Sequence, residues 1–239
     1  MCTRYVLLKE DLCELLARLG LGPDSKFVSR YNIAPSSFVP AVRNPPTESH
    51  HEVVTLRWGL VPSWAQTDGS GSQLVNARAE TVASKPSFRD AFRKRRCLIP
   101  ATGFYEWEHR GRVKRPWLFR PRHEQPFAFA GVWETWRAPD GTALETCALI
   151  TTEPNDLMRP IHDRFPVMLQ PEQFATWLDP RVTEPDELAP LLRAPPSESL
   201  IAVAVRRYVS NVRHEGPECL VPADAGEDGD GNQFSLGLS

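Results

Sequence analysis

Residues 97–107 read CLIPATGFYEW, and they open the part of the chain that decides the fold. Two short runs of apolar and aromatic residues, 97–99 and 104–107, lie on either side of turn-forming residues. Runs of this kind, bounded by Pro and Gly, predict β-strands. Similar runs follow at 117–120, 127–132, 144–151 and 167–169. Because turn signals rather than helices separate them, we expect a β-rich central region.

Helices are expected on both sides of this region. Residues 10–19 carry leucines at three-four spacing behind two acidic residues, a pattern typical of a helix, and Gly20 can end it. A second helix is expected near Ser87, because Ser87 and Asp90 resemble a capping box. The pattern also predicts strands at 53–58 and 201–205, a loop at 66–72, and helices at 171–178 and 185–191. Strands in the middle with helices at the flanks indicate the α+β class.

Composition is that of an ordinary folded protein. The 239 residues, 41% hydrophobic and 24% charged, fit one large or two small domains and exclude collagen and coiled coil. The longest apolar stretch, Phe127–Trp133, is far shorter than the roughly 20 residues that cross a bilayer, so no membrane contact is expected. No secretory signal pattern opens the chain, which predicts a cytoplasmic protein. The five cysteines show no CxxC spacing, so we expect no metal site, no disulfide framework and no cofactor.

Charge is distributed unevenly along the chain. Residues 222–239 carry four acidic residues and no basic one, so we expect a disordered tail behind a single folded domain of residues 1–221. Residues 76–96 hold seven basic residues against two acidic ones. This run predicts either a solvated face or a surface that binds a polyanion. No pattern indicates an oligomer interface, so a monomer is expected.

Cys2 is the first candidate for chemistry. Aminopeptidases remove Met1 when the next side chain is small, which would leave Cys2 as a 1,2-aminothiol. Its α-amine, with a pKa of about 7.7–8.0, and its thiol, with a pKa near 8.5, both reach nucleophilic forms near neutral pH. Together they can close an aldehyde into a thiazolidine ring. The alternative is that Cys2 is a small buried residue entering the first strand.

Three further residues could assist such a reaction. Glu106 is an acid inside an aromatic strand, where desolvation would raise its pKa and suit it for proton transfer. Strand alternation would instead place Glu106 on a solvated face together with Glu108. His162 follows Pro160 in a loop, where a titratable imidazole is suggestive, and Asn76 has an amide that could orient a substrate or serve in a turn. Alone, none of these residues identifies a function.

Seven ordered motifs give these residues a common context. They are MCTRY (1–5), RYNIAP (30–35), RWGLVPSW (57–64), NARAET (76–81), KPSFR (85–89), CLIPATGFYEW (97–107) and IHDR (161–164). In this order they resemble the SOS-response-associated peptidase (SRAP) family, which processes abasic sites in DNA, over roughly residues 2–212. The chain has Thr3 where the family usually has Gly, and Phe165 where Met is common. Since Thr3 adjoins the nucleophile, it could crowd Cys2 and slow the reaction.

The resemblance implies both a fold and an activity. The fold would be a curled, mostly antiparallel β core with flanking helices. The activity would be DNA repair, in which the mature Cys2 attacks the ring-opened aldehyde of an abasic site in single-stranded DNA and forms a thiazolidine crosslink. Asn76 would hold the amine or the sugar, Glu106 would shuttle protons and His162 would help to open the sugar ring. Abasic-site lyase activity and autoproteolytic removal of Met1 are further implied activities.

The resemblance also implies a positive groove for DNA. The residues that motif position assigns to it are Arg4, Trp64, Arg78, Trp107, Thr152 and Arg164. The arginines would contact phosphates and the threonine would add a hydrogen bond. The tryptophans would stack on bases or wedge between them, which suits a junction of single-stranded and double-stranded DNA. The alternative for both tryptophans is packing in the core.

Two rival functions remain open. One is a cysteine peptidase or amidohydrolase, in which Cys2 attacks an amide and His162 is the base, oriented by Asp163 or Glu106. Such an enzyme needs the thiolate but not a free α-amine. The other is a nucleic-acid-binding module without catalysis. That module would bind DNA equally well without the Cys2 thiol.

Overall fold

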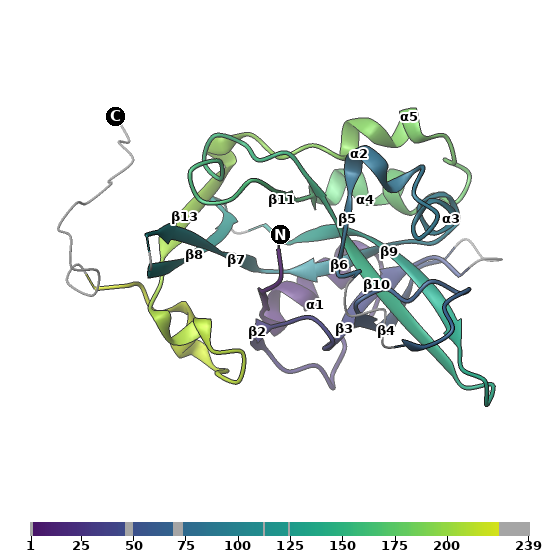
Figure 1. The fold of residues 1–239 in the computed structure, drawn as a ribbon, viewed down its shortest axis with the longest axis horizontal. Helices are drawn as coiled ribbons and strands as arrows, with labels where there is room; N and C mark the ends of the chain where they lie inside the picture. The colour runs from purple at the N-terminus through teal and green to yellow at the C-terminus, as the bar shows by residue number, and fades with distance from the viewer. Residues whose placement is uncertain (1, 46–49, 69–73, 112, 124, 225–239) are drawn as a thin grey trace.

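The computed structural model describes residues 2–45, 50–68, 74–111, 113–123 and 125–224, and this part of the chain is mostly β-structure with helices at its edges (Figure 1). Five strands close into a barrel because β10 pairs with β4 on one side and with β9 on the other. They are β3 (Phe38–Arg43), β4 (Glu52–Trp58), β6 (Arg96–Ala101), β9 (Phe127–Arg137) and β10 (Ala143–Thr152). Only the β10–β4 pairing among these described strands is parallel. The expected α+β class, with a curled and mostly antiparallel core, is confirmed.

Strand β6 shows why the apolar runs of this chain become barrel strands. All six of its residues are buried. Helices α1 (Lys9–Arg18) and α4 (Pro171–Leu178) both pack against β6, and the Trp177 indole of α4 donates a hydrogen bond of 2.9 Å to the Cys97 carbonyl. A strand that is covered on both faces has no solvated side, which explains its continuous apolar sequence.

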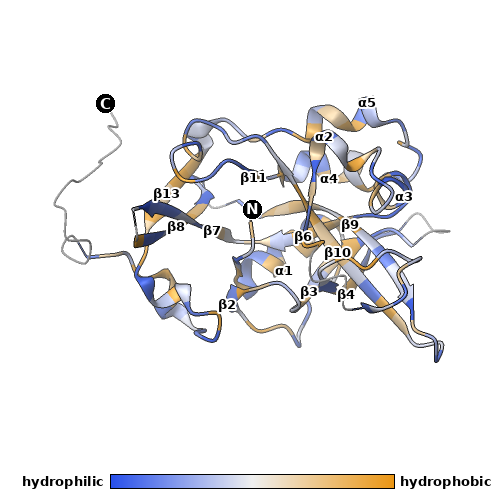
Figure 2. Cartoon of the chain, viewed as in Figure 1, coloured by the Kyte–Doolittle hydropathy of each residue, from blue (hydrophilic) through white to orange (hydrophobic). Residues whose placement is uncertain are grey.

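A second sheet of five strands lies beside the barrel, in the order β13-β8-β7-β1-β2. Its members are β1 (Tyr5–Leu7), β2 (Arg30–Ile33), β7 (Gly103–Arg110), β8 (Val113–Pro121) and β13 (Leu200–Ala204). The chain passes from the barrel to this sheet at Thr102, between β6 and β7. Gly103 permits this tight passage, because a Cβ atom there would lie 2.7 Å from the Phe119 carbonyl oxygen. In Figure 2, hydrophilic positions mark the β7–β8 hairpin, whereas apolar positions follow the barrel strands.

The N-terminal strand β1 joins the two sheets. Tyr5 is fully buried, and its ring packs edge-on against Trp58 and Phe129 of the barrel, with ring centroids 5.5 and 5.7 Å apart. The same residue pairs with Phe104 of β7 in the second sheet. Edge-to-face aromatic pairs contribute about 1 kcal/mol each beyond burial. The start of the chain is therefore held at the junction of the barrel and the second sheet.

Short elements complete the described chain. The strands are β5 (Asn76–Arg78), β11 (Phe165–Pro166) and β12 (Met168–Leu169), and the helices are α2 (Ala79–Val82), α3 (Arg89–Lys94) and α5 (Pro185–Leu188). Single 3-10 turns cover Ala189–Leu191, Ser197–Ser199, Arg207–Ser210 and Pro217–Leu220. Strands β5 and β11 both pair with the last residues of β10, so they meet at one end of that strand.

Several predicted elements need correction. The helix expected from Ser87 begins at Arg89, and its N-cap, Phe88, makes no side-chain cap bond, so the predicted capping box is wrong. The physical reason is a preceding turn, in which the Lys85 carbonyl accepts the amide hydrogens of Phe88 and Arg89. The helix expected at 185–191 is α5 followed by a 3-10 turn. Strands β2, β3 and β5 were not predicted: β2 and β5 are short and pair with distant strands, and Pro40 interrupts the apolar run of β3.

The basic run at 76–96 divides into different roles. Arg96 is only 6% exposed and donates hydrogen bonds to the carbonyls of Phe92, Arg93, Trp177 and Asp179. It joins α3 to the end of α4 and is not available to a ligand. Arg78, Arg89 and Arg93 are exposed. The run is therefore not one continuous basic face.

The first three residues of the predicted tail are not disordered. Pro222 forms a bridge with Val205, and Asp224 pairs with Arg206 at 2.6 Å, so residues 222–224 are attached to the body. Residues 225–239 lie outside the described residues, and so do 69–72 of the expected loop at 66–72. None of the described helices is long and apolar enough to span a membrane.

Candidate active site

Cys2 lies just before β1 and is completely buried. The Asn76 side-chain amide, at the start of β5, donates a hydrogen bond of 2.8 Å to the Cys2 carbonyl, and the Cys2 thiol lies 3.9 Å from the Arg4 carbonyl. Burial, followed by the nearby Glu106 carboxylate, raises the pKa of the Cys2 thiol well above its usual value. Cys2 is thus buried at the start of the first strand, as the alternative to a reactive nucleophile predicted, but the titratable Glu106 is near its thiol.

Glu106 of β7 is also buried, with 3% of its surface exposed. Burial raises its pKa to about 7; the positive N-terminal amine opposes this shift and Asp163 adds to it. Its Oε1 atom has no hydrogen-bond partner among the described residues. The predicted solvated face shared with Glu108 is wrong for Glu106: it lies at the covered end of β7, whereas Glu108, farther along, pairs with Arg110 at 2.8 Å.

His162 faces the Glu106 carboxylate from a loop after β10. Its Nε2 atom lies 4.0 Å from Glu106 Oε2, and its Nδ1 accepts a hydrogen bond of 3.0 Å from the Arg164 backbone N–H. Burial lowers the pKa of His162, although the adjacent Asp163 carboxylate, 3.0 Å from Nδ1, opposes the shift. Because its pKa lies below the usual 6.5, the ring is mainly neutral at pH 7.

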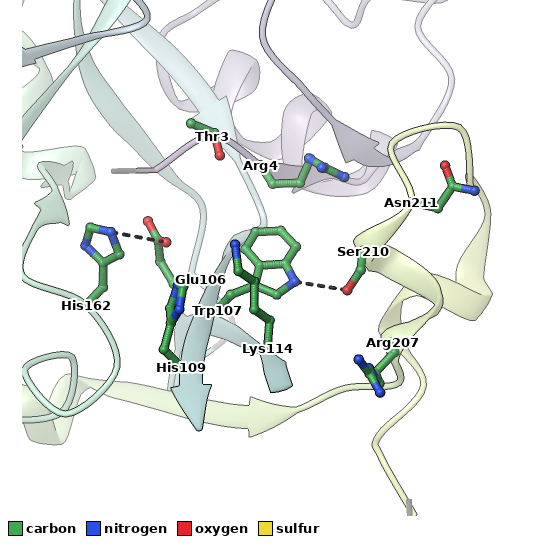
Figure 3. A pocket seen from close by; sticks show the side chains of 10 residues that line it. All are labelled: Thr3, Arg4, Glu106, Trp107, His109, Lys114, His162, Arg207, Ser210 and Asn211. Carbon is green, nitrogen blue, oxygen red and sulfur yellow. Dashed lines mark hydrogen bonds and ion pairs between the residues drawn. The ribbon is translucent and has the colours of Figure 1, made fainter. Parts of the chain in front are cut away.

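An open pocket of about 900 Å³ lies above these residues. Thr3, Arg4, Glu106, Trp107 and His162 line one part of it. Figure 3 shows Glu106 between His162 and Trp107, with Thr3 and Arg4 along the upper wall. Thr3, at the position where the sequence resemblance led us to expect Gly, thus lines the same pocket as Glu106. The remaining lining residues come from the end of the β7–β8 hairpin and from the C-terminal segment: His109, Lys114, Arg207, Ser210 and Asn211.

Arg4 lines the pocket but is mostly engaged with the protein itself. It is 8% exposed, and its NH1 donates to Asn32 Oδ1 at 2.7 Å and to the Val209 carbonyl at 3.1 Å. Its guanidinium lies 5.4 Å from the Trp107 ring centroid. Trp107 in turn donates its indole N–H to Ser210 Oγ at 3.0 Å. These contacts join the strand after Cys2 to the C-terminal wall of the pocket.

Three of the residues expected to contact DNA meet at the end of β10. Arg78 on β5 is exposed, and its side chain makes neither a hydrogen bond nor an ion pair with the described residues. Arg164 is held by both carboxylate oxygens of Glu80, at 2.8 and 2.9 Å, and lowers the Glu80 pKa. Thr152 is 8% exposed and pairs with Phe165. Of the two arginines, only Arg78 has its guanidinium open to a ligand.

The two tryptophans occupy different environments. Trp64 is 66% exposed in the turn after β4, so core packing is wrong for it, but it is not among the residues that line the pocket. Trp107 is half-buried in the pocket wall. No signal in the sequence pointed to His109, Lys114 or Arg207, because the hairpin and the C-terminal segment meet only in the fold. In the described chain, no three His, Cys, Asp or Glu side chains are grouped to hold a metal ion.

Comparison with known proteins gives consistent matches. A profile of the SOS response associated peptidase (SRAP) family matches residues 1–212. The abasic site processing protein YoqW of Bacillus subtilis is 39% identical over 223 residues, which cover 92% of this chain and 99% of that protein. The abasic site processing protein HMCES of Gallus gallus is 30% identical, over 85% of this chain and 69% of that protein.

Solved structures match as well. A crystal structure of a protein from Bacteroides thetaiotaomicron has a TM-score of 0.81 and 28% identity, covering 93% of this chain and 100% of that one. One from Bordetella bronchiseptica has a TM-score of 0.71 and 25% identity, covering 86% of this chain and 100% of that one. The barrel, the second sheet and the pocket at their junction thus lie within a shared fold.

Proposed function

This chain belongs to the SOS response associated peptidase (SRAP) family, and we propose that it is a DNA repair enzyme that captures abasic sites in single-stranded DNA covalently through Cys2. The relatives named abasic site processing proteins support DNA with abasic sites as the substrate. The observation that carries the proposal is a buried carboxyl, Glu106, whose pKa is about 7 and whose charge is close enough to raise the pKa of the Cys2 thiol.

The reaction needs a proton donor and a proton acceptor at one place. Once Met1 is removed, the Cys2 α-amine adds to the aldehyde carbon of the opened sugar and forms a carbinolamine. Glu106, about half protonated near pH 7, gives a proton to the hydroxyl group, which leaves as water and produces an imine. The Cys2 thiol then adds to the imine carbon, its proton passes through Glu106 to the nitrogen, and the thiazolidine ring closes. Aldehyde and aminothiol thus give thiazolidine and one water.

The neighbouring groups suit the steps before and after capture. His162 can give a proton to the ring oxygen as the sugar opens, and Glu106, 4.0 Å from Nε2, can replace it. Asn76 holds the Cys2 carbonyl and so orients the nucleophile. The imine intermediate also allows β-elimination, which makes abasic-site lyase activity a side reaction.

DNA contacts divide between open and engaged residues. Arg78 is the principal phosphate contact, because its guanidinium is exposed. Arg4, Arg164 and Thr152 border the site, and the two arginines act mainly by holding its walls. Trp107 in the pocket wall offers a surface for a base. The exposed Trp64 stands apart and suits a wedge at a junction of single-stranded and double-stranded DNA.

The thiol environment favours capture over peptide hydrolysis. A cysteine peptidase lowers the pKa of its thiol through a neighbouring imidazolium. Here the pKa of the Cys2 thiol is raised, its first charged neighbour is the Glu106 carboxylate, and the pKa of His162 is lowered. A raised thiol pKa is compatible with capture, because the thiol adds after the imine has formed.

Intact-mass spectrometry tests the proposal. The purified protein is measured before and after incubation with a single-stranded oligonucleotide that carries one abasic site. We expect loss of Met1, followed by an adduct with the mass of protein plus DNA minus one water. Cys2→Ala should form no adduct, whereas Cys13→Ala, which changes a half-buried thiol on α1, should react like the wild type.

Two outcomes would reject covalent capture. One is the absence of an adduct although Cys2 is the free N-terminus. The other is full reactivity after acetylation of the N-terminal amine, because a thiol hydrolase needs no amine and a thiazolidine does. Equal DNA affinity of Cys2→Ala and wild type, with no adduct in either, would support a passive binding module.

A further inference from the structure

The pocket extends well beyond the atoms that the capture reaction needs. Its outer part is formed by His109 and Lys114, which lie opposite each other on β7 and β8, and by Arg207 of the C-terminal segment. An open-chain sugar at Cys2 and Glu106 would leave this region empty. A volume of about 900 Å³ is in the range of pockets that enclose a whole ligand of roughly nucleotide size.

The charge of this outer region is positive, although the chain as a whole carries a formal charge of −2. The side chains of Lys114 and Arg207 form no hydrogen bond or ion pair within the described chain, and both residues are exposed. Glu106 is the one acidic residue in the pocket lining, and with a pKa of about 7 it is neutral in about half of the molecules at pH 7. The nearby carboxylate of Glu108 is occupied by Arg110 and by the Trp117 indole. An anionic ligand is therefore favoured.

The arrangement matches a phosphate attached to something flat. Lys114, Arg207 and the Trp107 indole all line this pocket, and Arg207 comes from the C-terminal segment (Figure 3). Ser210 and Asn211 add neutral polar groups on the same wall. A single-stranded nucleotide offers both an anionic phosphate and an aromatic base, which cationic and aromatic side chains bind together.

We propose that Lys114 and Arg207 bind the phosphate of the nucleotide next to the abasic sugar, with His109 beside it and the neighbouring base against Trp107. This inference rests on the proposed function, because that function supplies the DNA strand. It adds a second phosphate-binding region to Arg78, which is not among the residues that line the pocket. A strand passing between the two regions would present its abasic sugar to Cys2.

Binding of a non-reactive DNA tests this region apart from the chemistry. The probe is a single-stranded oligonucleotide with one tetrahydrofuran abasic analogue, which has no aldehyde. Lys114→Ala and Arg207→Ala should each weaken binding about fivefold to tenfold, as expected for a charged hydrogen bond. Each should lower the slope of log affinity against log salt by about 0.7. The matched controls are Lys26→Ala and Arg213→Ala, which remove exposed cations outside the pocket.

A chemical substitution identifies the phosphate. One neutral methylphosphonate is placed in turn at each linkage around the analogue. We expect Lys114 and Arg207 to contact one linkage next to the abasic sugar. A methylphosphonate at that linkage should weaken binding by the wild type, but it should have little further effect on Lys114→Ala or Arg207→Ala.

The outcomes separate this inference from the proposed function. The phosphate site would be overturned if Lys114→Ala and Arg207→Ala bound the analogue as tightly as the control variants. It would also be overturned if the effects of the methylphosphonate and of the substitutions on binding free energy were additive at every linkage. If the wild type forms no adduct but its analogue binding depends on both residues and one linkage, covalent capture is rejected and the phosphate site stands. Thermal unfolding of each variant verifies that it is folded.

Discussion

In the proposed reaction, Glu106 carries out most of the proton transfers. Its neighbours on β7 are aromatic, and the residues around the N-terminus and His162 cover it from solvent. The resulting pKa of about 7 lets the carboxyl give and take protons at neutral pH. A buried carboxylate without a hydrogen bond on Oε1 also carries a cost in stability, as is common at active sites.

Glu106→Gln should therefore increase stability and decrease activity. Because the folded-state pKa of Glu106 is raised above its unfolded value of about 4.5, the wild type loses stability as the pH rises from about 4.5 through 7. The neutral Gln variant does not. Its advantage in the free energy of unfolding should grow between pH 5 and pH 8, by up to about 3 kcal/mol. Urea unfolding at the two pH values measures it.

The same variant should capture abasic DNA more slowly with unchanged affinity for the tetrahydrofuran analogue. Glu10→Gln, at an exposed position on α1, is the control for the loss of one negative charge. A stability difference that is the same at pH 5 and pH 8 would contradict the raised pKa. A parallel loss of DNA affinity would contradict the role in proton transfer.

At the scale of elements, Asn32 of β2 connects the beginning of the chain to its end. Its amide nitrogen donates to the carbonyls of Val209, Asn211 and His214 at 3.2, 3.0 and 2.8 Å, and its oxygen accepts from Arg4. The side chain is 2% exposed. These bonds fix the C-terminal wall of the pocket relative to the strand that carries Cys2.

Asn32→Ala should loosen that wall. The buried carbonyls and the Arg4 guanidinium would lose their partner, which should cost about 2 kcal/mol in the free energy of unfolding. Amide hydrogen exchange in residues 209–214 should become faster. Asn155→Ala is the matched control, because Asn155 holds another loop through the Pro195 carbonyl. Equal protection of 209–214 in both variants would show that Asn32 does not hold the wall.

At the scale of the whole molecule, closure of the barrel depends on a close approach of β6 and β9. Gly131 of β9 pairs with Cys97 of β6, and a Cβ atom at Gly131 would lie 2.8 Å from Cys97 Sγ and 3.0 Å from Ile99 Cγ1. Such contacts are shorter than packed side chains tolerate. The barrel interior at this level therefore has no space for even one methyl group.

Gly131→Ala should consequently destabilise the protein by about 1–3 kcal/mol, since overpacking forces side chains and backbone to shift. Gly22→Ala is the control, because nothing lies within 4 Å of the Cβ position there. Urea unfolding of both variants measures the difference. A Gly131→Ala protein as stable as Gly22→Ala would contradict the close packing of β6 against β9.

The sequence by itself determined the local features of the protein. The apolar runs at 97–99, 104–107 and 127–132 predicted strands correctly, and the pattern at 171–178 predicted α4, because each reflects residues that are neighbours along the chain. Cys2 was identified for the same reason, since it directly follows Met1 in the sequence. The ordered motifs then indicated the family.

Only the tertiary structure decided how the site works. Strand alternation could not say that Glu106 is buried while Glu108 pairs with Arg110, because residues from the N-terminus and the His162 loop provide the cover. The partner of Arg164, Glu80, is 84 residues away, and Arg4 bonds to a carbonyl 205 residues away. Neither engagement has a local signal. Such long-range contacts form only when the chain has folded. They decide which arginines are open to a ligand, how far the pKa of Glu106 is raised, and which residues form the C-terminal wall of the pocket.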